Sequence, residues 1–138
     1  MTAYVLAAYR RTLVSTADRR ATVLYLFDAA IRSCRQAADA IDDGRVRDKC
    51  KHVDKALAAV AELAGALDLD NGGALAARLS SLYSFVMRAL VSANAANNPS
   101  AARGCLVVLR TLREGWEQIV SGRNPVKEAP GLYAGMSA

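Results

Sequence analysis

The fold of this chain is decided by one stretch, residues 67–94, which reads LDLDNGGALAARLSSLYSFVMRALVSAN. A polar, glycine-rich break opens the stretch, and apolar residues then recur three and four positions apart, which is the spacing of a buried helical stripe. The stripe consists of Leu75, Leu79, Leu82, Val86 and Leu90, with Tyr83, Met87 and Val91 beside it. This pattern predicts a helix that packs against other helices.

The break itself, from Asp68 to Gly73, is predicted to be a turn. Asp and Asn side chains accept hydrogen bonds from the free N–H groups of a helix start, and glycine permits backbone reversal. We therefore expect one helix to end near Leu67 and the next to begin after the glycines. An EF-hand calcium loop is not favoured, because Gly72 and Leu79 stand where side-chain oxygens are required. An anion-binding P-loop is not favoured either, because its Gly-Lys step is missing.

Three further amphipathic patterns surround this helix. Asp18 is a suitable N-cap for the first helix, Gly44 can end it, and Pro99 prevents continuation of the third, with Ser100 as the expected cap of the fourth. The predicted helices span 18–43, 46–69, 73–96 and 100–121. Short connections make consecutive helices run in opposite directions, so we expect an all-α antiparallel up-down four-helix bundle. Its core is expected to include Leu57, Leu82, Leu109 and Trp116.

Length and composition indicate a single domain. The chain has 138 residues, of which only 6% are aromatic, and this composition favours packed helices over β-structure. We expect an N-terminal arm over 1–17, the bundle over 18–121 and a C-terminal tail over 122–138. There is no secretory signal pattern, and the longest nearly apolar run, 56–67, is too short to cross a bilayer. We therefore expect a cytosolic protein without membrane insertion.

Few residues indicate catalytic or metal chemistry. Cys34, Cys50 and Cys105 have no paired spacing, so reduced thiols at buried helix positions are favoured over a metal site. The single histidine, His52, is not part of a Glu-x-x-His motif, and no nucleophile stands at a recognisable spacing from a base. The sequence therefore predicts a protein that is not an enzyme and that needs no cofactor.

A basic stripe runs along the second predicted helix. Arg47, Lys51 and Lys55 are four residues apart, and the whole chain has a net charge of +5. A solvated helix face is the simplest interpretation, with an acidic protein partner and nucleic acid as alternatives. Nucleic acid is the weakest of these, because aromatic residues do not alternate with the basic ones.

Three motifs in the right order give the chain a resemblance to a known family. The first comprises Leu67-Asp68, Gly72-Gly73, Leu79, Leu82-Tyr83 and Ala93-Asn94. The others are Thr16-Ala17 followed by Leu26-Phe27-Asp28-Ala29-Ala30-Ile31, and Leu112-Arg113-x-x-Trp116-x-x-Ile119. Together, from about Tyr9 to Val120, they resemble the FliS family of cytoplasmic export chaperones for flagellin. Asp18-Arg19 stands where the family usually has Ser-Pro.

The resemblance implies a function that periodicity alone does not contain. It implies binding of the C-terminal helical segment of flagellin, prevention of polymerisation in the cytoplasm, and delivery to the flagellar type III export gate. Helix-in-groove recognition is the physical mode expected for such a ligand. The expected partner-binding residues are Tyr9, Leu13, Leu69, Leu75, Leu79, Leu82, Tyr83, Val86, Met87, Leu90 and Asn94.

Other interpretations remain open at this point. Tyr83 at the edge of the bundle and Asn94 as a helix cap would be purely structural. A helical adaptor for another partner and a nucleic-acid-binding bundle are the alternative functions. In the resembled family the N-terminal arm, with a Tyr that matches Tyr9, covers part of the flagellin site, so the arm of this chain is expected to compete with flagellin.

Overall fold

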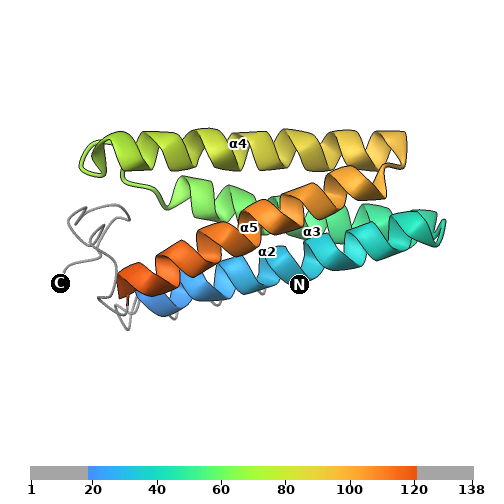
Figure 1. Cartoon of the computed structure of the whole chain (residues 1–138), viewed down its shortest axis with the longest axis horizontal. Helices are drawn as coiled ribbons and strands as arrows, with labels where there is room; N and C mark the ends of the chain where they lie inside the picture. Colours follow the sequence, from blue (N-terminus) through green and yellow to red (C-terminus); the bar gives the residue numbers. More distant parts are fainter. Residues whose placement is uncertain (1–18, 121–138) are drawn as a thin grey trace.

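The structure of the protein is a computed structural model that describes residues 19–120. It contains four α-helices, which are α2 (Arg19–Asp42), α3 (Val46–Gly65), α4 (Gly73–Ala96) and α5 (Pro99–Val120). Consecutive helices run in opposite directions along the long axis (Figure 1). Both α2 and α4 pack chiefly on α3 and α5, and α2 packs most closely on α3. The described part of the chain is therefore the antiparallel four-helix bundle that the sequence predicts.

The helix boundaries agree with the sequence prediction except at the end of α3. This helix ends at Gly65 rather than at residue 69. The N–H of Ala66 still bonds four residues back, to Glu62 at 3.0 Å, but that of Leu67 bonds only three residues back, to Ala64 at 3.3 Å, which breaks the α-helical pattern. Leu67 nevertheless stays buried and anchors the connection to the core. The predicted arm, 1–17, and tail, 122–138, lie outside the described residues.

Two of the three turns use the same left-handed stop. Gly44 has φ +69° after α2, and the N–H of Arg45 bonds to the carbonyl of Ala40 at 2.9 Å. Asn97 has φ +51° after α4, and the N–H of Asn98 bonds to the carbonyl of Ala93, also at 2.9 Å. In both places a six-to-one hydrogen bond satisfies a carbonyl of the last helical turn.

The starts of α4 and α5 differ from the predicted capping. The Asn98 side chain, not that of Ser100, accepts the N–H of Ala101 at 3.1 Å, directly before Pro99 starts α5. The carboxylate of Asp68 accepts the backbone and side-chain N–H groups of Asn71, at 3.1 and 2.9 Å, and these bonds lower its pKa. Asp68 thus closes the turn itself, and no side chain caps the start of α4.

The core is built largely from alanine where α2 meets its neighbours. Small side chains allow helix axes to approach closely, which explains the tight packing of α2 on α3. The fully buried alanines of these two helices are Ala30, Ala37, Ala40 and Ala56. Larger side chains fill the remainder, and the rings of Phe27 on α2 and Tyr83 on α4 lie 6.4 Å apart between their centroids.

Two of the four expected core residues are more exposed than predicted. Leu109 and Trp116 are buried as predicted, but Leu57 is only partly buried and Leu82 is 38% exposed. On α3, Val46 and Cys50 also lie at the solvent surface. Spacings of four residues from Val46 to Cys50 and three from Cys50 to buried Val53 would have placed them on the buried side of this helix. Val46 is the first residue of α3, where its side chain has little of the bundle to pack against. Leu82 is considered below with the rest of α4.

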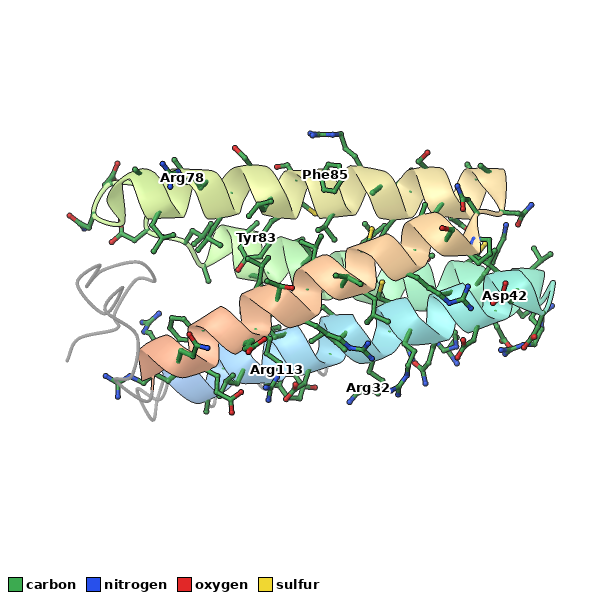
Figure 2. All side chains as sticks on the ribbon, viewed as in Figure 1. Arg32, Asp42, Arg78, Tyr83, Phe85 and Arg113 are labelled. Atoms are coloured by element: carbon green, nitrogen blue, oxygen red, sulfur yellow. The ribbon has the colours of Figure 1, made fainter. Side chains whose placement is uncertain are left out.

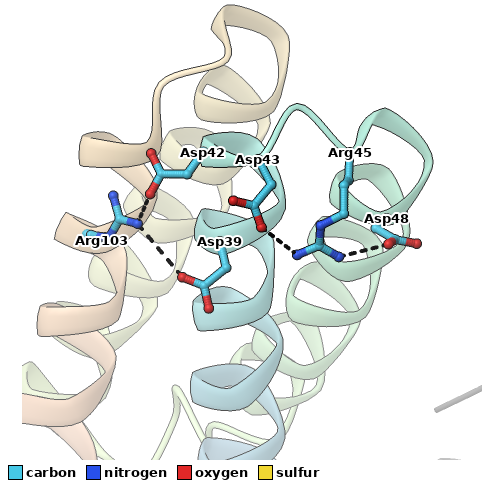
Figure 3. A network of polar contacts seen from close by, with 6 residues as sticks. All are labelled: Asp39, Asp42, Asp43, Arg45, Asp48 and Arg103. Atoms are coloured by element: carbon cyan, nitrogen blue, oxygen red, sulfur yellow. Dashed lines mark hydrogen bonds and ion pairs between the residues drawn. The ribbon is translucent and has the colours of Figure 1, made fainter.

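Ion pairs tie the exposed surface of α2 to α5 and to the start of α3. Arg103 of α5 pairs with Asp42 and, at 3.8 Å, with Asp39 (Figure 3). Arg45 bridges Asp43 at 3.3 Å and Asp48 at 2.8 Å in the adjacent turn. Exposed pairs of this kind contribute about 0 to 1 kcal/mol each, so they adjust stability rather than determine the fold.

Candidate partner-binding surface

One row of residues on α4 faces the bundle. It is called the inner seam here, and it contains Ala76, Leu79, Tyr83, Val86, Leu90 and Ala93, whose spacing alternates between three and four. All of them are buried except Leu79, which is partly buried. The predicted stripe contains some of these residues but takes Leu82 where the structure uses Tyr83. The helix is therefore rotated by about one residue, or 100°, at this turn relative to the prediction.

A second row on α4 has the same spacing but is directed away from the core. This outer seam consists of Leu75, Arg78, Leu82, Phe85 and Ala89, each one position before or after a residue of the inner seam. Leu82 is 38% exposed and Phe85 is 51% exposed, while Leu75 and Ala89 are partly covered. Two large apolar side chains thus lie at the centre of a solvent-exposed row with the spacing that packed helices use.

The outer seam lies on the side of α4 next to α5. On the opposite flank of α4, Asn94 contacts Lys49 and Cys50 of α3. Figure 2 shows Phe85 in front of the α4 ribbon, on the same side as α5, whereas Tyr83 lies between α4 and the helices below it. On α5, Val108 and Leu112 are partly buried and pack against the core. Gly104 and Gly115 of α5 adjoin open space, since a Cβ atom added at either would meet no atom within 4 Å.

The predicted binding residues divide into three groups in the structure. Tyr83, Val86 and Leu90 are fully covered in the core, so they support the surface of α4 from beneath. The partly exposed ones are Leu75, Leu79, Met87 and Asn94, and the exposed ones are Leu69 and Leu82. Tyr9 and Leu13 lie outside the described residues.

Phe85 was not among the predicted binding residues. Its place in the sequence contains a signal nonetheless, because it lies nearly opposite Tyr83 on a helical projection, where a solvated helix usually has polar residues. Val91 is also more than half exposed, on the flank opposite Leu82. Exposed apolar residues on both flanks of the inner seam show that α4 has apolar surface that its own bundle does not cover.

Asn94 contributes to the structure of the bundle through its backbone. The buried ammonium of Lys49, on α3, donates to the Asn94 carbonyl at 2.8 Å and to the Asn97 side-chain oxygen at 2.5 Å. Lys49 is only 8% exposed, and its charge lies at the C-terminal end of α4, where the helix dipole favours a cation. This contact fixes the end of α4 against the start of α3.

The arginines of α4 have no carboxylate partner in the described part of the chain. Arg78 and Arg88 are exposed, and α4 contains no Asp or Glu. The carboxylates that form ion pairs lie on other elements: Asp28 of α2 and Glu117 of α5, for example, pair with Arg113 at 2.6 and 2.9 Å. The surface of α4 is consequently apolar and cationic.

The alternative kinds of site are less well supported. Cys34 and Cys105 are buried as predicted, but Cys50 is exposed, so the prediction of a buried thiol is wrong for Cys50. Residues 19–120 contain no group of three or more potential metal ligands. Burial raises the pKa of Cys34 to about 12, so its thiol stays protonated. In the basic stripe of α3, Arg47 and Lys51 are exposed and Lys55 is partly exposed. This exposure agrees with the interpretation of the stripe as a solvated helix face.

The hydropathy of α4 is high for a bundle helix. Within the described residues, α4 alone is long and apolar enough to cross a membrane by length and composition, whereas the sequence analysis considered only the longest nearly apolar run, 56–67. Only 22% of its most apolar window is buried. The buried apolar residues of the inner seam explain part of this apolarity. The exposed outer seam explains another part.

The architecture and the exposed row on α4 define an all-α bundle with surface available to a partner. Comparison with known proteins identifies the family, since the model for "Flagellar protein FliS" matches residues 2–123. The chain belongs to the FliS family of flagellar secretion chaperones. Chaperones, rather than enzymes, make up this family.

Relatives from several bacteria match over most of their length. The flagellar secretion chaperone FliS of Salmonella typhimurium is 31% identical over 123 residues, covering 86% of this chain and 91% of the relative. That of Vibrio cholerae is 29% identical over 118 residues, covering 83% and 87%. That of Bacillus subtilis is 25% identical over 127 residues, covering 92% and 94%. The resemblance seen in the sequence motifs thus extends over the whole bundle.

Proposed function

We propose that this chain binds the C-terminal helical segment of flagellin in the cytosol, keeps it from polymerising, and delivers it to the flagellar type III export apparatus. Membership of a family of flagellar secretion chaperones supports this function. The observation in the structure that carries it is the outer seam of α4, where Leu82 and Phe85 are exposed in a row with helix-packing spacing.

The physical basis is burial of apolar surface on both partners. A segment that assembles through apolar contacts in a filament exposes those contacts while it is a monomer, and a chaperone prevents assembly by covering them. Leu82, Phe85 and Leu69 supply exposed apolar area on this chain, at about 25 cal/mol for each Å² removed from water. Tyr83, Val86 and Leu90 hold that surface in place from within the core.

Two further parts of the proposal concern the arm and the export machinery. Tyr9 and Leu13 would cover part of the binding surface in the free chaperone and move when flagellin arrives. Delivery requires that the loaded chaperone also contact a component of the export gate. These parts follow from the family resemblance and rest on residues outside 19–120.

Co-purification tests the main proposal. Full-length flagellin should be retained at one chain per chaperone, whereas flagellin that lacks its C-terminal segment should be lost. Phe85→Ser should weaken retention, and Val107→Ser, on α5 and 62% exposed, is the matched control that should leave it unchanged. Equal retention of the two flagellin forms would refute binding through the C-terminal segment.

A further inference from the structure

The charge of the described helices is distributed unevenly. Residues 71–113 contain five arginines and no Asp or Glu, so this stretch alone carries the net charge of +5 that the whole chain has. Arg103 and Arg113 are neutralised by carboxylates of α2 and α5. Arg78 and Arg88 on α4 have no such partner within the described residues. Arg110, exposed on α5, has no such partner among the described residues either, so two of the three unpaired arginines of this stretch lie on α4.

These two arginines flank the exposed apolar centre of the outer seam. Arg78 belongs to the seam itself, and Arg88 adjoins its last residue, Ala89. At 1.5 Å per residue they are about 15 Å apart along the helix, with Leu82 and Phe85 between them. In helix pairs, apolar residues at three-four spacing provide the contact, and charged residues at its margin select the partner.

We infer that the outer seam of α4 binds an amphipathic helix whose apolar residues pack on Leu82 and Phe85 and whose carboxylates, about three turns apart, pair with Arg78 and Arg88. This inference rests on the proposed function: the helix would belong to the C-terminal segment of flagellin. It adds to that function a requirement for acidic residues in the bound segment.

The α4 helix of a second copy of this chain does not meet the requirement. In a parallel pair of α4 helices Arg78 would face Arg78, and in an antiparallel pair centred on Leu82 and Phe85 it would face the turn that carries Arg88. Like charges in such positions repel and select against the pairing. The outer seam therefore disfavours self-association through α4.

The terminal segments of the chain do not meet the requirement either. Residues 1–17 contain Arg10 and Arg11 but no Asp or Glu, and residues 122–138 contain one Glu, which follows an Arg and a Lys. Neither sequence offers two carboxylates three turns apart. An acidic helix from another protein is thus the complement that the charges favour.

The test is a double charge reversal, Arg78→Glu with Arg88→Glu, in the full-length protein. The matched control is Arg32→Glu with Arg35→Glu, because both of these arginines are exposed on α2 and the change in net charge is the same. Figure 2 shows Arg32 on the opposite side of the bundle from α4. Circular dichroism melting of each variant verifies that the fold is intact.

We expect the α4 reversal to weaken flagellin binding about 10- to 100-fold in about 0.05 M salt, and the α2 control to change it less than about threefold. The difference should shrink in about 0.5 M salt, because the charges are exposed and screened. Unchanged flagellin binding by the α4 reversal would overturn the inference while leaving the proposed function intact. Loss of binding to phosphatidylglycerol vesicles, with flagellin binding unchanged, would overturn it in favour of a lipid surface.

A synthetic peptide pair keeps the inference testable if the chain does not bind flagellin, which would refute the proposed function itself. One helical peptide has Leu at three-four spacing and two Glu residues ten positions apart, and its twin has Gln in place of Glu. Tighter binding of the Glu peptide, lost in the α4 reversal, would support the inference. Equal binding of the two peptides would overturn it.

Discussion

The free energy of unfolding of two leucine-to-alanine variants on α4 shows which seam of this helix stabilises the bundle. Leu90 is fully buried in the inner seam, so Leu90→Ala removes packed atoms and leaves a cavity, at a cost of about 2–5 kcal/mol. Leu82 belongs to the outer seam and is 38% exposed, so Leu82→Ala opens a smaller and partly solvated gap. We expect it to cost less than about 1 kcal/mol.

Urea unfolding followed by far-ultraviolet circular dichroism gives both free energies on a common scale. For a bundle of about 100 residues, 1 kcal/mol corresponds to a shift of about 4–8 °C in Tm, so the two variants should be separated clearly by heating as well. Flagellin binding should show the reverse order, with Leu82→Ala weakening it more than its stability loss explains. Equal destabilisation by both variants would refute the assignment of the two seams.

Further predictions concern individual side chains and the arm. Lys49→Met should lower the free energy of unfolding in urea by about 1.5–3 kcal/mol, because two acceptors at the end of α4 lose a charged donor. Lys51 is exposed on the same helix, so Lys51→Met should cost less than about 0.5 kcal/mol. Native protein should react rapidly with a thiol reagent at Cys50 alone, and modification of the two buried thiols at the same rate would contradict their burial. Burial, and then the charge of Lys55, lowers the pKa of His52 below its ordinary value near 6.5. The contribution of His52 to the free energy of unfolding should therefore be complete above that pH and fall as the pH drops below it. His52→Gln should remove this part of the pH dependence, and an unchanged pH profile in the variant would exclude His52 as its cause. Removal of residues 1–15 should raise ANS fluorescence or light scattering of the free protein, and no change in either, nor in flagellin affinity, would exclude the arm from the mechanism.

The sequence contains enough information for the number, direction and approximate limits of the helices. Four runs of three-four spacing, separated by Gly44, by Gly72-Gly73 and by Pro99, are local signals, and the structure confirms each of them. The rotation of α4 could not be obtained in the same way. Leucines and alanines occur around most of this helix, so two adjacent seams fit the spacing equally well.

Long-range contacts decide what periodicity leaves open. Tyr83 rather than Leu82 faces the core because its ring packs beside Phe27 of α2, more than fifty residues away in the sequence. Lys49 appears in the sequence as one more cation of a basic helix, and only the fold brings it to the end of α4. Both contacts depend on how α2 and α3 are rotated about their axes relative to α4, and no local sequence pattern specifies that rotation.

The way in which α4 is held suits it to present a surface. Its C-terminal end is fixed by Lys49 and by the left-handed turn at Asn97, and its N-terminal end follows buried Leu67 and the turn closed by Asp68. Between these ends the bundle covers the inner seam and part of its neighbours, such as Leu75 and Ala89, but leaves Leu82 and Phe85 exposed. A helix fixed at both ends loses little conformational freedom when a ligand packs on its free side, so more of the apolar burial contributes to affinity. The exposed row on α4 is therefore a preorganised surface, and in the inference above Arg78 within it and Arg88 beside it would restrict which helices can bind.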